Sequence, residues 1–193
     1  MRIFYVCMKR NIAETIFNTI AEIITATEII FSRESLSRKL SQLEMKGCFD
    51  NRCLNRSLKR FETQGMLRRI KDKGKEHFKL TPAGLKKLSA FRLDRNFKAI
   101  SRNWDGFWRL VIFDIPEDQK TIREGLRNRL KFYGFYPLQK SVFVYPCSCE
   151  KEIEELSDFF ELGGNLDTLL VKSLGKKEKE VRQFFESLNI IEK

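Results

Sequence analysis

Side chains that carry out covalent catalysis are scarce in this sequence of 193 residues. Its single histidine, His77, is a poor basis for a Ser–His or Cys–His catalytic unit. The 5 cysteines are an odd number, and Cys48 and Cys53 lack partners at the spacing of zinc ligands. We therefore expect free thiols, no structural zinc site and no required cofactor, and we do not expect an enzyme.

A basic segment, residues 51–64, has the side-chain spacing of a helix that reads DNA. On a wheel of about 100° per residue, Leu54, Leu58 and Phe61 fall within about 60° and form the buried stripe. The opposite side carries the polar residues Arg52, Asn55, Arg56 and Lys59, with Arg60 beside them. In a major groove, Arg pairs with guanine and Asn with adenine. The alternative is a solvated basic face, which for an isolated helix would be the preferred interpretation.

The distribution of charge favours a polyanion partner for the first half of the chain. The net charge is +11. Residues 1–103 hold 23 Lys and Arg against 10 Asp and Glu, whereas residues 104–193 hold 14 against 16. Because solubility does not require such segregation, the pattern indicates a nucleic-acid-binding domain joined to a nearly neutral one.

The order of elements in the first half predicts a winged helix-turn-helix domain over residues 1–91. Helical spacing covers residues 9–30, Ser32 caps a second helix, and residues 51–64 form the third. Two strands, 66–71 and 76–80, then flank a polar turn, and Thr81-Pro82 begins a closing helix. The third helix and the wing would contact double-stranded DNA, with phosphates held by Arg60, Lys71, Lys73 and Lys75. We assign His77 a structural role or a phosphate contact.

The second half, residues 104–193, predicts a ferredoxin-like domain that follows a basic connector at 92–103. Strands at 109–115, 135–139, 141–145 and 166–174 alternate with helices at 117–132 and 150–161. The resulting βαββαβ order, with a tail helix at 176–188, is the split βαβ pattern. The expected fold class is therefore α+β.

Two runs in this half, WDGFWRLVIFDIP at 104–116 and GFYPLQKSVFVYP at 134–146, strongly resemble the central domain of PaaX-type transcriptional repressors. In that family a winged helix precedes a domain similar to the small CRISPR adaptation nuclease-like subunit of the Cas-two type. Full-length members carry a further C-terminal domain, so this chain resembles a short form. The resemblance implies a repressor that binds operator DNA as a homodimer, with Ser141–Tyr145 as a pairing element. It also allows a small-molecule effector, whose identity stays open.

Asp114 carries the alternative function, a metal-dependent nuclease. It ends the first strand of the second domain, at the position where the CRISPR-associated relatives hold a nuclease aspartate. A carboxylate there could bind Mg²⁺, assisted by Glu117 and Asp118. We favour the simpler interpretation, in which these acids serve a local turn and a helix start. A third hypothesis is an adaptor that binds DNA without sequence preference.

No stretch of the sequence approaches the ~20 apolar residues that a membrane span needs. The apolar run Ile3–Met8 is too short for the core of a signal peptide and has no cleavage site after it. We therefore expect a cytoplasmic protein with no membrane partner.

Overall fold

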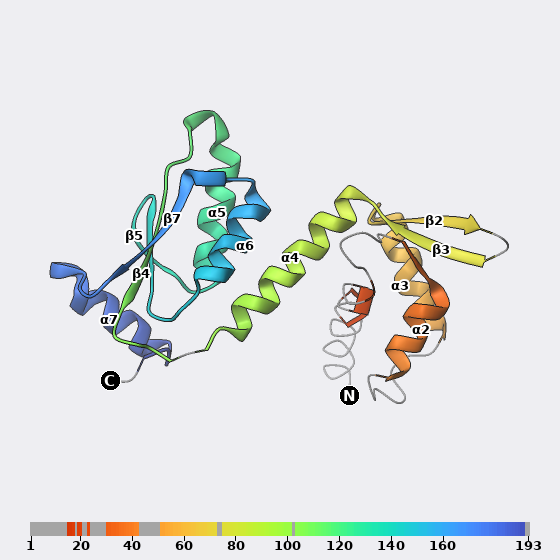
Figure 1. The fold of residues 1–193 in the computed structure, drawn as a ribbon, viewed down its shortest axis with the longest axis horizontal. Coiled ribbons are helices and arrows are strands. Elements are labelled where there is room, and N and C mark those ends of the chain that lie inside the picture. Colours follow the sequence, from red (N-terminus) through yellow and green to blue (C-terminus); the bar gives the residue numbers. More distant parts are fainter. Residues whose placement is uncertain are drawn as a thin grey trace, which may run out of the picture. The chain divides into compact units, whose positions relative to one another are not determined.

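The computed structural model describes residues 15–17, 19, 20, 23, 30–42, 51–72, 75–101 and 103–191, and it divides into two units. The first unit is Met1–Arg92 and the second is Leu93–Lys193. Both combine helices with a sheet (Figure 1), as the predicted α+β class requires. Residues 15–17, 19, 20 and 23 are helical. The rest of the predicted 9–30 helix, and residues 1–8, lie outside the described residues.

The N-terminal unit places helices beside a small antiparallel sheet. Its elements are β1 (Ile30–Ser32), α2 (Arg33–Gln42), α3 (Asn51–Thr63), β2 (Leu67–Asp72), β3 (Lys75–Leu80) and α4 (Pro82–Ala99). The strand order is β1-β3-β2. Strand β1 is absent from the prediction because its three residues form a strand only by pairing with β3, with Phe31 opposite Phe78. Ser32 caps α2 as predicted, since its Oγ accepts a hydrogen bond from the Ser35 amide at 3.0 Å.

The core of this unit is built from the apolar stripes of its helices and the inner face of its sheet. Helix residues in the core include Ile16, Phe17, Leu36, Leu40, Leu54 and Leu58. Phe31, Leu67, Phe78 and Leu80 contribute from the strands. Each such side chain stabilises the fold by about 1.5–3 kcal/mol when it leaves water.

The start of helix α4 is locked against the chain that enters the hairpin. The Thr81 hydroxyl donates to the Gly65 carbonyl at 2.6 Å and accepts from the Gly84 amide at 3.1 Å. The Thr81 amide also donates to the Met66 carbonyl, at 3.1 Å. A Cβ at Gly84 would lie 2.0 Å from that carbonyl oxygen and 2.8 Å from Leu80 Cδ2. Glycine is therefore required at position 84 by close packing against backbone.

Helix α4 contributes to the cores of both units in turn. Leu88 lies in the N-terminal core, whereas Leu93 and Phe97 lie in the C-terminal core. Residues 92–99, which the sequence assigned to a connector, are helical, and two of them are buried. In the C-terminal unit, Phe97 stacks on Tyr133 with ring centroids 3.8 Å apart.

The C-terminal unit has the predicted βαββαβ order followed by a tail helix. Its elements are β4 (Trp108–Phe113), α5 (Lys120–Phe132), β5 (Tyr136–Gln139), β6 (Val142–Tyr145), α6 (Glu150–Phe160), β7 (Leu166–Val171) and α7 (Glu178–Ser187). The antiparallel sheet has the order β5-β6-β4-β7. Short 3-10 turns at Glu117–Gln119, Gly163–Asn165 and Gly175–Lys177 precede α5, β7 and α7.

The two faces of this sheet carry different helices, with α5 and α6 on one side and α7 on the other (Figure 1). Consecutive side chains of β4 follow this division. The Arg109 side chain contacts Glu150 of α6, whereas the Trp108 indole nitrogen donates to Glu178 of α7 at 2.9 Å. Phe185 of α7 is fully buried and packs on Trp108, with ring centroids 5.9 Å apart.

Ser141–Tyr145 was expected to pair with a second copy of the chain, and this is wrong for pairing through a sheet edge. Strand β6 lies between β5 and β4, and Phe143, Val144 and Tyr145 are buried in the core. An apolar run does not distinguish an interior strand from an interface strand, because both exclude water. The edges of the described sheet are β5 and β7.

No helix in the described part of the chain is both long and apolar enough to cross a membrane.

We predict that Gly84→Ala destabilises the N-terminal unit by about 1–3 kcal/mol, because the new methyl group forces the Met66 carbonyl to move. The two tryptophans, Trp104 and Trp108, both lie in the C-terminal unit. In chemical denaturation, the substitution should therefore lower the midpoint of the circular-dichroism transition, which reports both units, more than that of the fluorescence transition, which reports the C-terminal unit. Gly164→Ala, where a Cβ meets nothing within 4 Å, is the control. Wild-type stability of the Gly84 variant would contradict the packing argument.

Candidate nucleic-acid interface

Helix α3 carries its apolar and basic side chains on opposite faces. Leu54, Leu58 and Phe61 are only 2%, 1% and 4% exposed, which confirms the predicted buried stripe. The side chains predicted to read bases are all exposed, and they are Arg52, Asn55, Arg56 and Lys59. On an ideal helix these four lie within about 100° of arc, and Arg60, also exposed, lies at their side. The structure thus brings the predicted α3 residues together on one solvent-facing surface.

The orientation of α3 is set by burial of its apolar residues, of which Phe61 packs on another aromatic ring. Phe61 meets Phe17 edge-to-face, with ring centroids 4.5 Å apart. Leu54, Leu58 and Phe61 all belong to the N-terminal core. Turning the basic face inward would expose these three side chains, at a cost of several kcal/mol. The basic face is therefore held outward by burial of the other face.

A second interaction, centred on Arg69, joins the end of α3 to the hairpin. The Arg69 guanidinium donates to Glu62 at 2.8 and 3.0 Å and to Glu76 at 2.8 Å. It also lies over the Phe78 ring, 5.3 Å from the centroid. Hydrogen bonding from Arg69 lowers the pKa of the Glu62 carboxyl. Arg69 is thus neutralised within the fold and aligns the hairpin with α3.

The other cations of the hairpin are turned toward solvent. Lys71 and Lys75, both predicted phosphate contacts, are exposed, whereas Lys73 lies outside the described residues. Arg68 and Lys79 are exposed as well, and neither was predicted to contact DNA. Their Cα atoms are paired across the ladder. Only the strand register shows that Arg68 and Lys79 are neighbours, because they are eleven positions apart in the chain.

His77 lies in β3 with its Cα opposite Ile70 and Ser32 in the two flanking strands. Its Nδ1 atom is buried and has no hydrogen-bond partner among the described residues. The ring is therefore integrated into the sheet surface, and its predicted structural or phosphate-contact role stays a prediction.

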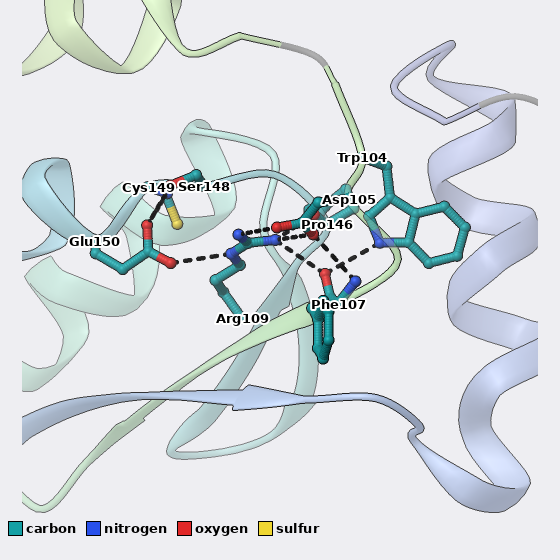
Figure 2. Close-up of polar contacts among 8 residues, drawn as sticks. All are labelled: Trp104, Asp105, Phe107, Arg109, Pro146, Ser148, Cys149 and Glu150. Carbon is teal, nitrogen blue, oxygen red and sulfur yellow. Dashed lines mark hydrogen bonds and ion pairs between the residues drawn. The ribbon is translucent and has the colours of Figure 1, made fainter.

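In the C-terminal unit, the WDGFWR segment forms a polar network around a buried guanidinium (Figure 2). Arg109 is only 4% exposed. It donates two hydrogen bonds of 2.6 Å to the Asp105 carboxylate and one of 3.0 Å to Glu150. The carbonyls of Phe107 and Pro146 accept further bonds at 3.1 and 3.0 Å. These acceptors offset the cost of removing the charge from water.

The same network shapes the loop that enters β4. The Trp104 indole nitrogen donates to the Phe107 carbonyl at 3.0 Å, and the Phe107 amide donates to Asp105 at 3.1 Å (Figure 2). Arg182 of α7 lies 4.5 Å from the centroid of the Trp104 ring. The motif residues therefore fix architecture, and their types are explained without a catalytic role.

No disulfide joins Cys53, Cys147 and Cys149 in the described part of the chain, as predicted, whereas Cys7 and Cys48 lie outside the described residues. Cys147 and Cys149 are buried, and burial raises the pKa of the Cys149 thiol. A thiolate at Cys149 is therefore disfavoured.

Asp114, the candidate nuclease residue, is exposed just after β4. Its backbone amide donates to the Asn165 carbonyl at 2.9 Å. Glu117 accepts bonds of 2.8 and 3.1 Å from Arg123, and Asp118 is exposed. Within the described residues, no three His, Cys, Asp or Glu side chains are grouped so that they could hold a metal ion. The Glu117 carboxylate, which was predicted to assist a metal, is thus bonded to Arg123.

We predict that Asp105→Asn lowers the stability of the C-terminal unit by about 1–2 kcal/mol at neutral pH, a modest loss because Asp105 is half-exposed. Hydrogen bonding from Arg109 lowers the pKa of Asp105 from 3.8 to about 2. This contribution is complete above pH 4 and is lost as the pH falls toward 2. The difference between wild type and variant, followed by tryptophan fluorescence, should shrink over that range. A stability difference that stays constant between pH 4 and pH 2, or an equal loss of stability in the exposed control Asp167→Asn, would contradict this prediction.

Comparison with known proteins identifies one part of the chain. Residues 101–183, less than half of it, match the family model described as the PaaX protein central Cas2-like domain. None of the curated proteins matches the chain. The matched range contains both runs on which the resemblance rested, the β4–β7 sheet and the Arg109 network. The C-terminal unit is therefore similar to the PaaX protein central Cas2-like domain.

Proposed function

We propose that this protein is a DNA-binding transcriptional regulator of the PaaX-like type, a repressor that occupies operator DNA as a dimer. The observation that carries the proposal is the outward basic face of α3. It combines two guanidinium groups and one amide, the groups that pair with base edges, on one side of a helix whose other side is buried. The family match in the C-terminal unit supports the same class of protein.

The N-terminal unit has the features of a winged helix-turn-helix domain. Helices α2 and α3 precede a two-stranded hairpin, β2 and β3, and α4 follows. In such a domain the helix before the hairpin enters the major groove, and the hairpin contacts the backbone. Arg52, Asn55, Arg56 and Lys59 then face bases. Phosphate contacts fall to Arg60, Lys71, Lys73 and Lys75.

Dimerisation would place two such helices on one DNA molecule. Strand β7 is an edge strand, with Leu169 and Leu170 respectively 49% and 56% exposed. The other edge, β5, contains Pro137, which lacks a donor for pairing. We therefore assign the contact between copies to β7, in place of the interior strand β6. A two-fold dimer reads two half-sites that are one helical turn, or a multiple of it, apart.

We predict that Arg56→Ala combined with Lys59→Ala abolishes the preference for a sequence selected from random DNA. The loss of a bidentate contact should cost about 1–3 kcal/mol, or roughly fivefold to 150-fold in affinity for the selected site. Titrations by fluorescence anisotropy with selected and random duplexes measure it. The control is Lys131→Ala with Lys151→Ala, two exposed lysines of the C-terminal unit that change the net charge equally.

Unchanged affinity for the selected site would overturn the assignment of α3 as the reading helix. Equal affinity of the wild type for selected and random DNA would instead favour an adaptor that binds DNA without sequence preference.

We predict that Leu169→Lys with Leu170→Lys converts the dimer to a monomer, because charge on the β7 edge opposes pairing between strands. Both side chains are exposed in the single chain, so tryptophan fluorescence should report unchanged folding. Sedimentation velocity gives the oligomeric state, and Leu188→Lys, at a leucine 42% exposed beyond α7, is the control. A wild type that sediments as a monomer, or a variant that remains dimeric, would contradict the β7 assignment.

A further inference from the structure

Strand β2 carries two consecutive exposed arginines that differ in their face and in their partners. Side chains alternate across a strand, so Arg68 and Arg69 point to opposite faces of the hairpin. Arg69 shares its face with Phe78 and Glu76 and is bonded to Glu62 and Glu76. Arg68 lies on the outer face and is exposed.

The outer face places Arg68 directly opposite a second cation. Its Cα partner in β3 is Lys79, and the partner of Lys79 in β1 is Ile30. All three side chains are exposed, Ile30 by 45%. They form a row across the three strands, which we call the outer row. Like charges directly opposite each other destabilise an antiparallel pair.

Glu76 of the hairpin does not neutralise this row. It is on the inner face and accepts a hydrogen bond from Arg69. No ion pair joins Arg68 or Lys79 to any residue in the described ranges.

We propose that Arg68 and Lys79 form a second phosphate-binding surface, which holds the sugar–phosphate backbone of the duplex that α3 reads. The inference rests on the proposed function, and it adds a surface separate from the α3 face and from the tip of the hairpin. A row of two opposed cations is costly in the free protein and becomes favourable beside a polyanion. Exposed Ile30 offers an apolar neighbour for deoxyribose.

Duplex DNA fits this surface better than an acidic protein segment does. The same small unit presents exposed cations on α3, on the hairpin and on the outer row, and such a spread of charge suits a long polyanion better than a short acidic segment. Point charges on long, flexible stems suit phosphates, which are recognised without base information. Arg68 and Lys79 should therefore add affinity equally for every DNA sequence.

The test is the salt dependence of DNA binding by Arg68→Gln with Lys79→Gln in the full chain. Each phosphate contact contributes about 0.9 to the slope of log K against log salt. Two lost contacts should therefore make the fall in affinity between 50 and 200 mM salt about tenfold smaller than in wild type. The matched control, Lys131→Gln with Lys151→Gln, removes the same net charge from the C-terminal unit. The charge-preserving exchange Arg68→Lys with Lys79→Arg should keep the wild-type slope.

Two results would overturn the outer-row assignment. One is a slope for Arg68→Gln with Lys79→Gln equal to that of the control pair. The other is a loss of affinity confined to the selected sequence, which would indicate base reading. Failure of the proposed function looks different, because the wild type would then bind no DNA, or Arg56→Ala with Lys59→Ala would leave sequence preference intact. Circular dichroism verifies folding, and removing the like-charge pair should leave the thermal midpoint unchanged or raise it.

Discussion

Burial of Leu54, Leu58 and Phe61 is the interaction on which the proposed reading surface depends. These side chains decide which side of α3 faces the core, and everything on the opposite side follows from helical geometry. Neither Arg56 nor Lys59 has to be positioned by a contact of its own. The basic face is a consequence of apolar packing, so damage to the core would disturb the proposed DNA recognition without touching any residue proposed to contact DNA.

The chain uses arginine in two distinct ways, and only the surroundings separate them. Arg69 and Arg109 form hydrogen bonds and ion pairs with acceptors of the protein itself, so their charge is neutralised within the protein. Arg52, Arg56 and Arg68 are exposed and remain available to a polyanion. A count of basic residues therefore overstates the proposed binding surface. The ion-paired arginines act as supports, since Arg69 ties α3 to the hairpin and Arg109 ties the entry loop to β4 and α6.

In the C-terminal unit, the sequence pattern predicted the order of the elements but not their neighbours in the sheet. In the C-terminal unit, apolar runs bounded by Pro and Gly predicted the order of strands and helices, and that order is confirmed. The pattern could not predict which strands are edges, because Val142–Tyr145 and Leu166–Val171 are both rich in apolar residues. Strand order depends on how the chain crosses over, which is a tertiary property, so β6 is interior and β7 is exposed. The chemistry at Asp114 shows the same limit, because its neighbour Glu117 is engaged by Arg123 from a later helix turn.

Local spacing alone was sufficient for the α3 stripe, the α+β class and the split βαβ order, because periodicity and capping residues act over a few positions along the chain. The three-residue strand β1, the pairing of Arg68 with Lys79, and the neutralisation of Arg69 and Arg109 required the folded chain. Each of these joins residues that are distant in sequence or places neighbours on opposite faces. Register and ion pairing across elements are set by packing of the whole unit, and no local pattern encodes them.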